Sequence, residues 1–360
     1  MISRLNVERE RRRKRKKRIR ALILVLEVII LLALGVVAFA MRKLDLMDKV
    51  NIESVITNET LNDEDYTNIA LFGIDAREGE TIGVRSDTII IASLDNVNKN
   101  LRLVSVYRDS FLRLEGTEGP YYAKANDAYA IGGPQEAVNM LNRNLDLNIQ
   151  DYVTVNFGSM SDIVDLLGGI EIGMMREEVI HMNNYCVETS EVTGKEYEPI
   201  EPPEVMGTYN LNGVQAVSYA RIRATDGGDF KRTERQRLIL EKIMEKAKQT
   251  NIFQLNKIAN KVLPEVSTSL DIKTILKIGE ALLNYEMLDS TGFPYETALP
   301  SEIPGYSGSY VVPVNLLNNV TQLHNSLFPD VEYVPSDMLN LISGDIIYLT
   351  GIATLEDAYY

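Results

Sequence analysis

The feature that most constrains this chain is a run of twenty mostly apolar residues near its N-terminus, ALILVLEVIILLALGVVAFA at 21–40. As a helix, a run of this length spans about 30 Å, the thickness of the hydrocarbon core of a bilayer. Ten Lys and Arg residues precede it in 9–20, whereas only two follow it closely. Because the cytoplasmic flank carries the excess of positive charge, we expect 1–20 to be a cytoplasmic basic segment and 21–41 a single transmembrane helix.

Two other interpretations of this N-terminus compete with a membrane anchor. Ala38-Phe39-Ala40 has the form of a signal-peptide cleavage site, although the apolar run is long for a cleaved signal. The basic run suggests nucleic-acid binding, but it is too short to form a folded DNA-binding domain. We therefore favour an uncleaved, single-pass anchor in the cell membrane. A polar stalk at 42–65 then leads to an extracellular folded part.

Charge and composition limit the chemistry of that folded part. The whole chain has a net charge of −14, but beyond residue 42 it holds 25 basic and 48 acidic residues, a net of −23. A body this acidic is not a general nucleic-acid binder, and any anion it binds needs a local cluster of arginines. One cysteine excludes an internal disulfide. With only two histidines, zinc clusters and histidine-based triads are not expected either.

Three short apolar or β-branched runs predict strands, at 68–74, 88–94 and 101–107. If they form an antiparallel meander, Asp75 and Asp87 share one edge of the sheet and Arg108 returns beside them. The loop between the first two strands adds Arg77 and Arg85 to the same rim. Two carboxylates among arginines are typical of a metal held by oxygen ligands, with the arginines on a phosphate. The expected metal is Mg²⁺, which often takes only one or two protein carboxylates.

The densest cluster of arginines is RIRATDGGDFKRTERQR at 221–237. A helix is predicted from Lys231 to about Lys248, after the break at TDGGD. On a helical wheel, three side chains at its start continue the later buried stripe: Arg232, Arg235 and Gln236. Lys231 and Arg237 are predicted to face solvent. Arginines that point inward at a helix N-terminus favour bound anions.

Arg221 and Arg223 lie two residues apart in AVSYARIRA, 216–224. If that segment is a strand, both side chains face the same side. Together with the inward arginines of the following helix they would form a pyrophosphate clamp, in which Asp229 orients one guanidinium.

Four other segments were interpreted. Lys124 precedes a probable helix and, taken alone, is a surface lysine. The segment 181–207 is predicted to be a loop or insertion. A helical face in 313–328 indicates packing on the main domain. The acidic, Tyr-rich tail 330–360 has no pattern that assigns it a structure.

An ordered set of motifs resembles one known family. These motifs are FGIDAR (72–77), RSDT (85–88), YRDS (107–110), KANDAYAIGG (124–133), DLLGGIEI (165–172), LNGVQAVSYARIR (211–223) and GDFKRTERQ (228–236). In kind and order they are similar to those of the LytR-CpsA-Psr family of membrane-anchored cell-envelope phosphotransferases. The resemblance covers about 66–250 and continues more weakly to about 282. The chain departs from it at Tyr107, where the family usually has a proline that fixes the backbone.

The resemblance implies an α/β/α sandwich with a mixed central sheet, preceded by one transmembrane helix. We expect a catalytic domain at 66–290 and a C-terminal extension at 291–360 packed on it. The implied activity moves a glycopolymer from undecaprenyl pyrophosphate to peptidoglycan through a phosphodiester. Nucleic acid is not an expected partner. The polyprenyl tail would lie in an apolar pocket that the sequence does not reveal.

Site roles implied by the resemblance follow its motifs. Asp75 and Asp87 would hold Mg²⁺ or Mn²⁺. The residues expected to act in catalysis are Arg108, Arg221, Arg223 and Asp229. The residues expected to bind pyrophosphate are Arg85, Lys124, Arg232, Arg235 and Gln236. The general base is not assigned, with Asp75 and Asp109 as candidates.

Two other functions are compatible with the same residues. With water as acceptor, the site would be a polyprenyl-pyrophosphate phosphatase. Without catalysis, it would be an envelope sensor that binds the same lipids. The presence of both Asp75 and Asp87 favours an enzyme.

Overall fold

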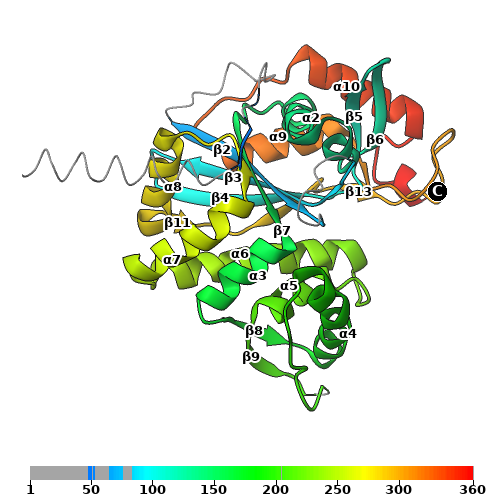
Figure 1. Ribbon diagram of the computed structural model, residues 1–360. Helices are drawn as coiled ribbons and strands as arrows, with labels where there is room; N and C mark the ends of the chain where they lie inside the picture. The colour runs from blue at the N-terminus through cyan, green and yellow to red at the C-terminus, as the bar shows by residue number, and fades with distance from the viewer. Residues whose placement is uncertain (1–47, 51, 53–64, 76–82, 204, 360) are drawn as a thin grey trace, which may run out of the picture. The chain divides into compact units, whose positions relative to one another are not determined.

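A mixed sheet of eight strands lies at the centre of the fold (Figure 1). The computed structural model describes residues 48–50, 52, 65–75, 83–203 and 205–359. The strand order is β1-β10-β7-β2-β3-β4-β11, with β12 also paired to β4. The strands of this sheet are β1 Asp48–Lys49, β2 Tyr66–Ile74, β3 Ser86–Asp95, β4 Asn100–Val106, β7 Asp151–Asn156, β10 Ser267–Thr268, β11 Glu286–Met287 and β12 Thr291–Phe293. Both β2–β3 and β3–β4 are antiparallel, so the predicted meander is confirmed.

The two faces of this sheet are covered by different helices (Figure 1). Side chains alternate along β3, so that Ile89 and Ile91 belong to one core cluster while Ile90 and Leu94 belong to another. The first cluster packs against α2 Asp127–Leu145, α9 Leu316–Leu327 and α10 Asp337–Thr350. The second packs against α6 Gly228–Lys248 and α8 Ile272–Asn284. Helices on both faces of a mixed sheet confirm the predicted α/β class.

A smaller lobe with its own core lies beside α6. It contains α3 Phe157–Leu166, β8 Ile170–Met174, α4 Arg176–Thr193, β9 Gly207–Leu211 and α5 Gly213–Arg221. The prediction of a loop across 181–207 is wrong for its first half, which belongs to α4. Val179, Met182 and Cys186 recur on one buried face of that helix. Burial also raises the pKa of the Cys186 thiol, which agrees with an inert cysteine.

The segment 216–224, treated above as a strand, is instead helix α5 followed by an extended turn, so that interpretation is wrong. The side chain of Asn212 accepts a hydrogen bond from the backbone of Gln215, and the Gln215 side chain accepts one from the backbone of Asn212. This capping box starts a helix that ends at Arg221. Arg221 and Arg223 therefore do not share a strand face, and they contact different partners.

Helix α6 begins at Gly228, three residues before the predicted start. Its N-cap is Gly227, which has a left-handed φ of 86° that glycine adopts without strain. The predicted helix in 313–328 is confirmed as α9, whose Leu316, Val320, Leu323 and Leu327 are buried.

The C-terminal residues 291–360 supply more than an extension. They contribute β12 to the central sheet, and they place both α9 and α10 over one of its faces. The tail without a predicted structure contains α10, which Ser336 caps through its side chain.

The remaining described elements connect these layers. They are the hairpin β5 Phe111–Gly116 and β6 Gly119–Lys124, the helix α7 Ile252–Val262, the short pair β13 Thr297–Ala298 and β14 Val312–Pro313, and the 3-10 turns Leu263–Glu265 and Asp357–Tyr359. None of the described helices combines the length and the apolar character that crossing a bilayer requires. The transmembrane prediction at 21–41 and Arg77 lie outside the described residues. Within the predicted stalk, Asp48–Lys49 form β1 beside β10.

Candidate active site

A cavity of about 610 Å³ opens between the central sheet and the smaller lobe. The sheet strands β2, β3 and β7 form one wall, and helices α3, α4, α5 and α6 form the others. Its polar lining residues include Asp75, Asp87, Arg108, Arg221, Arg223, Arg232 and Gln236. The cavity thus brings together seven predicted site residues from four separate segments, 72–77, 85–88, 107–110 and 221–237.

The rest of this cavity is lined largely by apolar side chains. They include Ile90, Val155, Phe157, Met160, Ile163 and Ile239. A second cavity of about 250 Å³, lined by aliphatic and Met side chains, shares Leu71, Val153 and Leu240 with the first. The two cavities therefore adjoin and present a long apolar surface between the sheet and helices α6 and α8. One end of the combined space is charged, and the rest suits a hydrocarbon chain.

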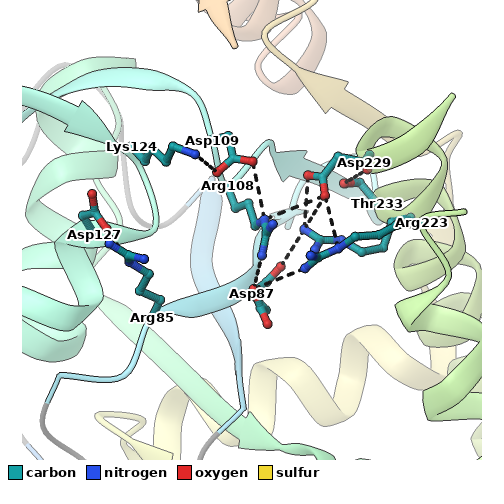
Figure 2. A network of polar contacts seen from close by, with 10 residues as sticks. Arg85, Asp87, Arg108, Asp109, Lys124, Asp127, Arg223, Asp229 and Thr233 are labelled. Atoms are coloured by element: carbon teal, nitrogen blue, oxygen red, sulfur yellow. Dashed lines mark hydrogen bonds and ion pairs between the residues drawn. The ribbon is translucent and has the colours of Figure 1, made fainter. Parts of the chain in front are cut away.

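Three arginines and two aspartates form the charged end, which we call the site cluster: Asp87, Arg108, Arg223, Asp229 and Arg232. Figure 2 shows Asp87, Arg108, Arg223 and Asp229 pointing toward one another. The Arg108 guanidinium forms a short ion pair with the Asp87 carboxylate and lies 3.7 Å from Asp229. Arg223 lies 3.8 Å from Asp87 and 3.7 Å from Asp229. Each carboxylate is thus shared among several guanidinium groups, which together exceed the carboxylates in charge.

Arg232 is the most buried member of the site cluster, with 2% of its surface exposed. Its Nη2 donates to the Asp229 carboxylate at 3.2 Å and to the backbone oxygen of Asp87 at 3.3 Å. Its Nε is buried without a hydrogen-bond partner among the described residues. A buried, unsatisfied guanidinium N–H beside a cavity is a donor available for an anion.

The pKa values of Arg232 and Arg108 are shifted in opposite directions by their neighbours in the site cluster. Burial lowers the pKa of Arg232 to about 10; Asp229 opposes this shift, and the like charges of Arg108 and Arg223 add to it. Burial would also lower the pKa of Arg108, but Asp229, Asp109 and Asp87 outweigh it and hold that pKa above its ordinary value. Both side chains therefore remain charged at neutral pH, and a second negative charge near Arg232 would relieve repulsion.

Arg221 reaches the cavity from a different wall. Its Nη2 pairs with Glu188 at 3.0 Å, and its Nη1 donates to the Thr189 hydroxyl at 3.0 Å. The guanidinium also lies over the rings of Phe157, at 4.9 Å, and Tyr185, at 5.8 Å. This aromatic support holds the positive charge at the boundary between the polar and apolar parts of the cavity.

The donor set at the charged end fits a hard divalent cation. Asp75, directly after β2, is exposed, and Asp87 is the second residue of β3; both line the cavity. Among the described residues, no group of three or more His, Cys, Asp or Glu side chains gathers as a metal site. Two carboxylates beside a cluster of arginines still match Mg²⁺, which often takes only one or two protein carboxylates.

Three predicted pyrophosphate residues do not line the cavity. Arg85 is 63% exposed and pairs with Asp127 at 2.6 Å. Lys124 pairs through its Nζ with Asp109 at 3.0 Å (Figure 2). Asp127 and Asp109 thus pair with the two cations that were predicted to bind pyrophosphate.

The third, Arg235, is enclosed by the smaller lobe. Its Nε donates to Glu178 at 2.9 Å, its Nη1 to the Ile222 carbonyl at 3.1 Å, and its Nη2 to the Thr225 hydroxyl at 2.7 Å. We call these four residues the Arg235 junction. The prediction that Arg237 faces solvent is wrong, because it is 6% exposed and donates from Nε to the Ser290 hydroxyl. Arg237 is buried because α6 packs against the smaller lobe on one side and against the central sheet on another.

The sequence missed the contribution of α4 and α3 to the site. Glu188, Tyr185 and Phe157 all line the cavity, and all three contact Arg221. Glu188 and Tyr185 fall in the segment that was expected to be a loop. The signal that was available is the spacing of Val179, Met182 and Cys186, which identifies an amphipathic helix.

Comparisons with known proteins agree with this arrangement. The model of the LytR_cpsA_psr family matches residues 37–324. Two curated relatives are each 32% identical to the chain. One is the polyisoprenyl-teichoic acid–peptidoglycan teichoic acid transferase TagV of Bacillus subtilis, matched over 52% of this chain and 46% of its own length. The other is the transferase TagU of Enterococcus faecalis, matched over 58% of this chain and 62% of its own length. The matches thus span about half to three fifths of these relatives.

A solved structure shares the fold. It is the LytR-CPS2A-psr family protein YwtF (TagT) with bound octaprenyl pyrophosphate lipid, which superimposes with a TM-score of 0.56 at 20% identity. The superposition covers 77% of this chain and 99% of that one.

Proposed function

The chain belongs to the LytR_cpsA_psr family, and on that premise we propose that it is a membrane-anchored, extracellular phosphotransferase. Its reaction moves a glycopolymer from undecaprenyl pyrophosphate to peptidoglycan through a phosphodiester. The observation that carries the proposal is the cavity, in which a long apolar space ends at the site cluster. A polyprenyl pyrophosphate has this same division, a long hydrocarbon chain that ends in two phosphates.

The arginines supply the binding and charge stabilisation that phosphoryl transfer requires. Arg108, Arg223 and Arg232 converge on the two carboxylates of the site cluster, and Arg221 approaches from α5. Guanidinium groups bind phosphate oxygens with two parallel hydrogen bonds, and they stabilise the charge that develops in the transition state. We infer that pyrophosphate displaces part of the present ion pairing, with Gln236 donating from the same wall.

The proposed step is a direct displacement at phosphorus. A peptidoglycan hydroxyl oxygen attacks the phosphorus nearest the sugar, and the bond from that phosphorus to the bridging oxygen breaks. The leaving group is undecaprenyl phosphate. Of the two candidate bases, Asp75 lines the cavity, whereas Asp109 is engaged by Lys124 at 3.0 Å and lies 3.6 Å from Arg108. We therefore propose that one oxygen of the Asp75 carboxylate accepts the hydroxyl proton, which leaves the other oxygen to hold a cation.

Asp75 and Asp87 are the residues that would hold Mg²⁺ or Mn²⁺. When bound there, such an ion neutralises phosphate charge and favours departure of undecaprenyl phosphate. The site residues themselves orient the two phosphates and keep water from the reacting phosphorus. The anchor at 21–41 would keep the cavity near the membrane surface where the lipid donor resides. The relatives' names make teichoic acid the first polymer to test.

The test uses the purified full-length chain with Mg²⁺, a synthetic polyprenyl-pyrophosphate glycan and peptidoglycan oligomers, and mass spectrometry follows the glycan. Glycan joined to peptidoglycan by a phosphodiester, and lost with EDTA and in Asp87→Ala, is the expected result. Free glycan phosphate in the presence of acceptor would instead identify a phosphatase. Tight binding of the lipid with no product would identify a sensor, and either result would overturn the transferase.

A further inference from the structure

The strand that delivers Arg108 to the site is held against α6 by the residue before it, Tyr107. The Tyr107 ring packs edge-to-face on Phe230 of α6, with ring centroids 4.6 Å apart. Phe230 directly follows Asp229 and lies two residues before Arg232. One aromatic contact therefore joins the end of β4, which carries Arg108, to the part of α6 that carries the rest of the charged end.

The backbone around Tyr107 fixes this arrangement further. The Tyr107 N–H donates to the carbonyl of Phe293 on β12 at 2.9 Å, and its carbonyl accepts from Ser110 at 2.9 Å. The carbonyl of Arg108 accepts from Asn126 at 3.0 Å. The backbone is thus held on both sides of Arg108, and the Tyr107 side chain can only extend across β12 towards α6.

Glycine at position 292 makes room for that side chain. A Cβ at Gly292 would lie 2.1 Å from the Tyr107 hydroxyl oxygen and 2.6 Å from its Cζ. Gly292 pairs with Ser105 in the parallel β12–β4 ladder, so the contact is made by a strand that cannot easily move away. The two positions are sterically matched, since the Tyr107 ring at its present depth requires glycine opposite.

The hydroxyl end of the Tyr107 ring lies near the charged side chain of Arg237 on α6. Burial raises the pKa of Tyr107, and the nearby Arg237 guanidinium opposes this rise. Arg237 is held in turn by the Ser290 hydroxyl at 3.2 Å, just before β12. The ring therefore contacts β12 on one side and α6 on the other, and its hydroxyl end lies near a fixed cation.

We propose that Tyr107 is a positioning residue for the proposed transferase site, and that Gly292 is its steric complement. The ring sets the spacing between β4 and α6, and through it the placement of Arg108 against Asp87 and Asp229. Tyr107 is not one of the residues that line the cavity, so it acts through the placement of Arg108 and of the α6 residues beside Phe230. The inference rests on the proposed function for its kinetic consequence, and on the contacts above for its geometry.

The experiment compares full-length Gly292→Ala, Tyr107→Leu, the double variant and Tyr107→Phe. Gly344→Ala is the matched control, because an added Cβ there meets nothing within 4 Å. The readouts are the unfolding midpoint, the Kd for inorganic pyrophosphate, and kcat and KM with the lipid-linked donor.

We expect Gly292→Ala to weaken pyrophosphate binding and lower kcat by about tenfold or more, since its methyl group displaces the Tyr107 ring and with it Arg108. Tyr107→Phe keeps the ring and should retain nearly wild-type kinetics. The double variant should be no worse than Tyr107→Leu alone, because the methyl group no longer meets a ring. Gly344→Ala should match the wild type.

Independent, additive losses in the double variant would overturn the inference, as would wild-type pyrophosphate affinity and kcat in folded Gly292→Ala. If Gly292→Ala does not fold, Tyr107→Leu and Tyr107→Phe decide, and equal kinetics in both would also overturn it. A wild-type chain that neither binds pyrophosphate nor transfers glycan would refute the proposed function instead. The geometry would then be judged from a crystal structure of Gly292→Ala, in which an unmoved Arg108 refutes it.

Discussion

Arg232 and Arg235 lie three residues apart on α6 and are almost equally buried, with 2% and 5% of their surfaces exposed. Their surroundings nevertheless differ. In the Arg235 junction, each guanidinium nitrogen has its own partner, at 2.7 to 3.1 Å. In the site cluster, Nη2 of Arg232 is shared between Asp229 and the Asp87 backbone, and its Nε has no partner among the described residues.

The difference separates a structural ion pair from a binding site. The Arg235 junction matches one guanidinium to one carboxylate and two neutral acceptors, so it leaves no capacity for a ligand. The site cluster sets three guanidinium groups against two carboxylates, and all its members except Asp229 line a cavity. Both arginines point inward from the helix, so direction does not distinguish them, whereas incomplete pairing beside a cavity makes Arg232 the candidate for binding.

The largest effect is predicted for Arg232→Ala. Its loss removes the deepest cation of the site, and we expect kcat/KM for glycan transfer to fall by about 10³-fold or more. Asp229 keeps Arg108 and Arg223 as partners, so the unfolding midpoint should change little. Steady-state kinetics and thermal unfolding of the same preparation measure both quantities. Activity within tenfold of the wild type would refute the assignment of Arg232 to the site.

Arg235→Ala should do the opposite and affect stability first. It leaves Glu178, whose side chain is 14% exposed, without its cation, and we expect a loss of about 3 kcal/mol in the free energy of unfolding. The rate per folded molecule should stay within a few-fold of the wild type. Adding Glu178→Gln removes the unpaired charge and should restore part of the stability, as measured by urea unfolding. A specific loss of pyrophosphate binding in folded Arg235→Ala would place Arg235 in the site after all.

A pH titration tests a third polar region, far from the cavity. His324 is 2% exposed, lies 2.8 Å from the Leu145 carbonyl through Nε2, and stacks on Tyr333. Burial lowers its pKa from 6.5 to about 4, against smaller opposing effects of the Leu145 hydrogen bond and Asp146. The unfolded chain therefore binds the proton more readily than the folded one.

The consequence is a loss of stability on acidification. The contribution of His324 is present in full above pH 6.5 and is lost progressively as the pH falls towards 4, by at most about 3 kcal/mol. Urea unfolding at stepped pH measures this slope, which His324→Gln should flatten. A slope unaffected by His324→Gln would contradict the prediction.

The strands of the site were predictable because each is a short local pattern that ends in a charged residue. Strands that follow one another along the chain commonly pair with each other, so the sequence alone predicted that Asp87 and Arg108 converge at one edge. The inward direction of Arg232 followed from the period of its helix. These predictions depend on spacing along the chain and on little else.

Most of the rest depended on tertiary contacts that no local pattern encodes. The basic, β-branched segment before Arg223 resembles a strand, but the capping box at Asn212 makes it a helix. The separation of Arg235 from the cavity depends on Glu178, a residue 57 positions away. Arg237 is buried because β12 returns to the sheet edge and places Ser290 beside it. The misses at Arg235 and Arg237 involve partners distant in sequence, which is where packing overrides propensity, whereas the capping box of α5 is a local signal.

The smallest predicted effect concerns Glu188, which places a carboxylate in the cavity. It pairs with Arg221 at 3.0 Å while 60% of its side chain is exposed, so solvent screens the pair and it contributes little to stability. A phosphate that approaches Arg221 must compete with this carboxylate and is also repelled by it.

Glu188→Gln should therefore tighten binding of inorganic pyrophosphate by about threefold at low salt, and the gain should vanish in high salt. Calorimetric titration at two salt concentrations measures it, with exposed Glu191→Gln on the same helix as the control. Weaker binding in Glu188→Gln would contradict this prediction. It would show that the Glu188 carboxylate holds Arg221 in place, so that the Glu188–Arg221 pair is structural, as the Arg235–Glu178 pair is.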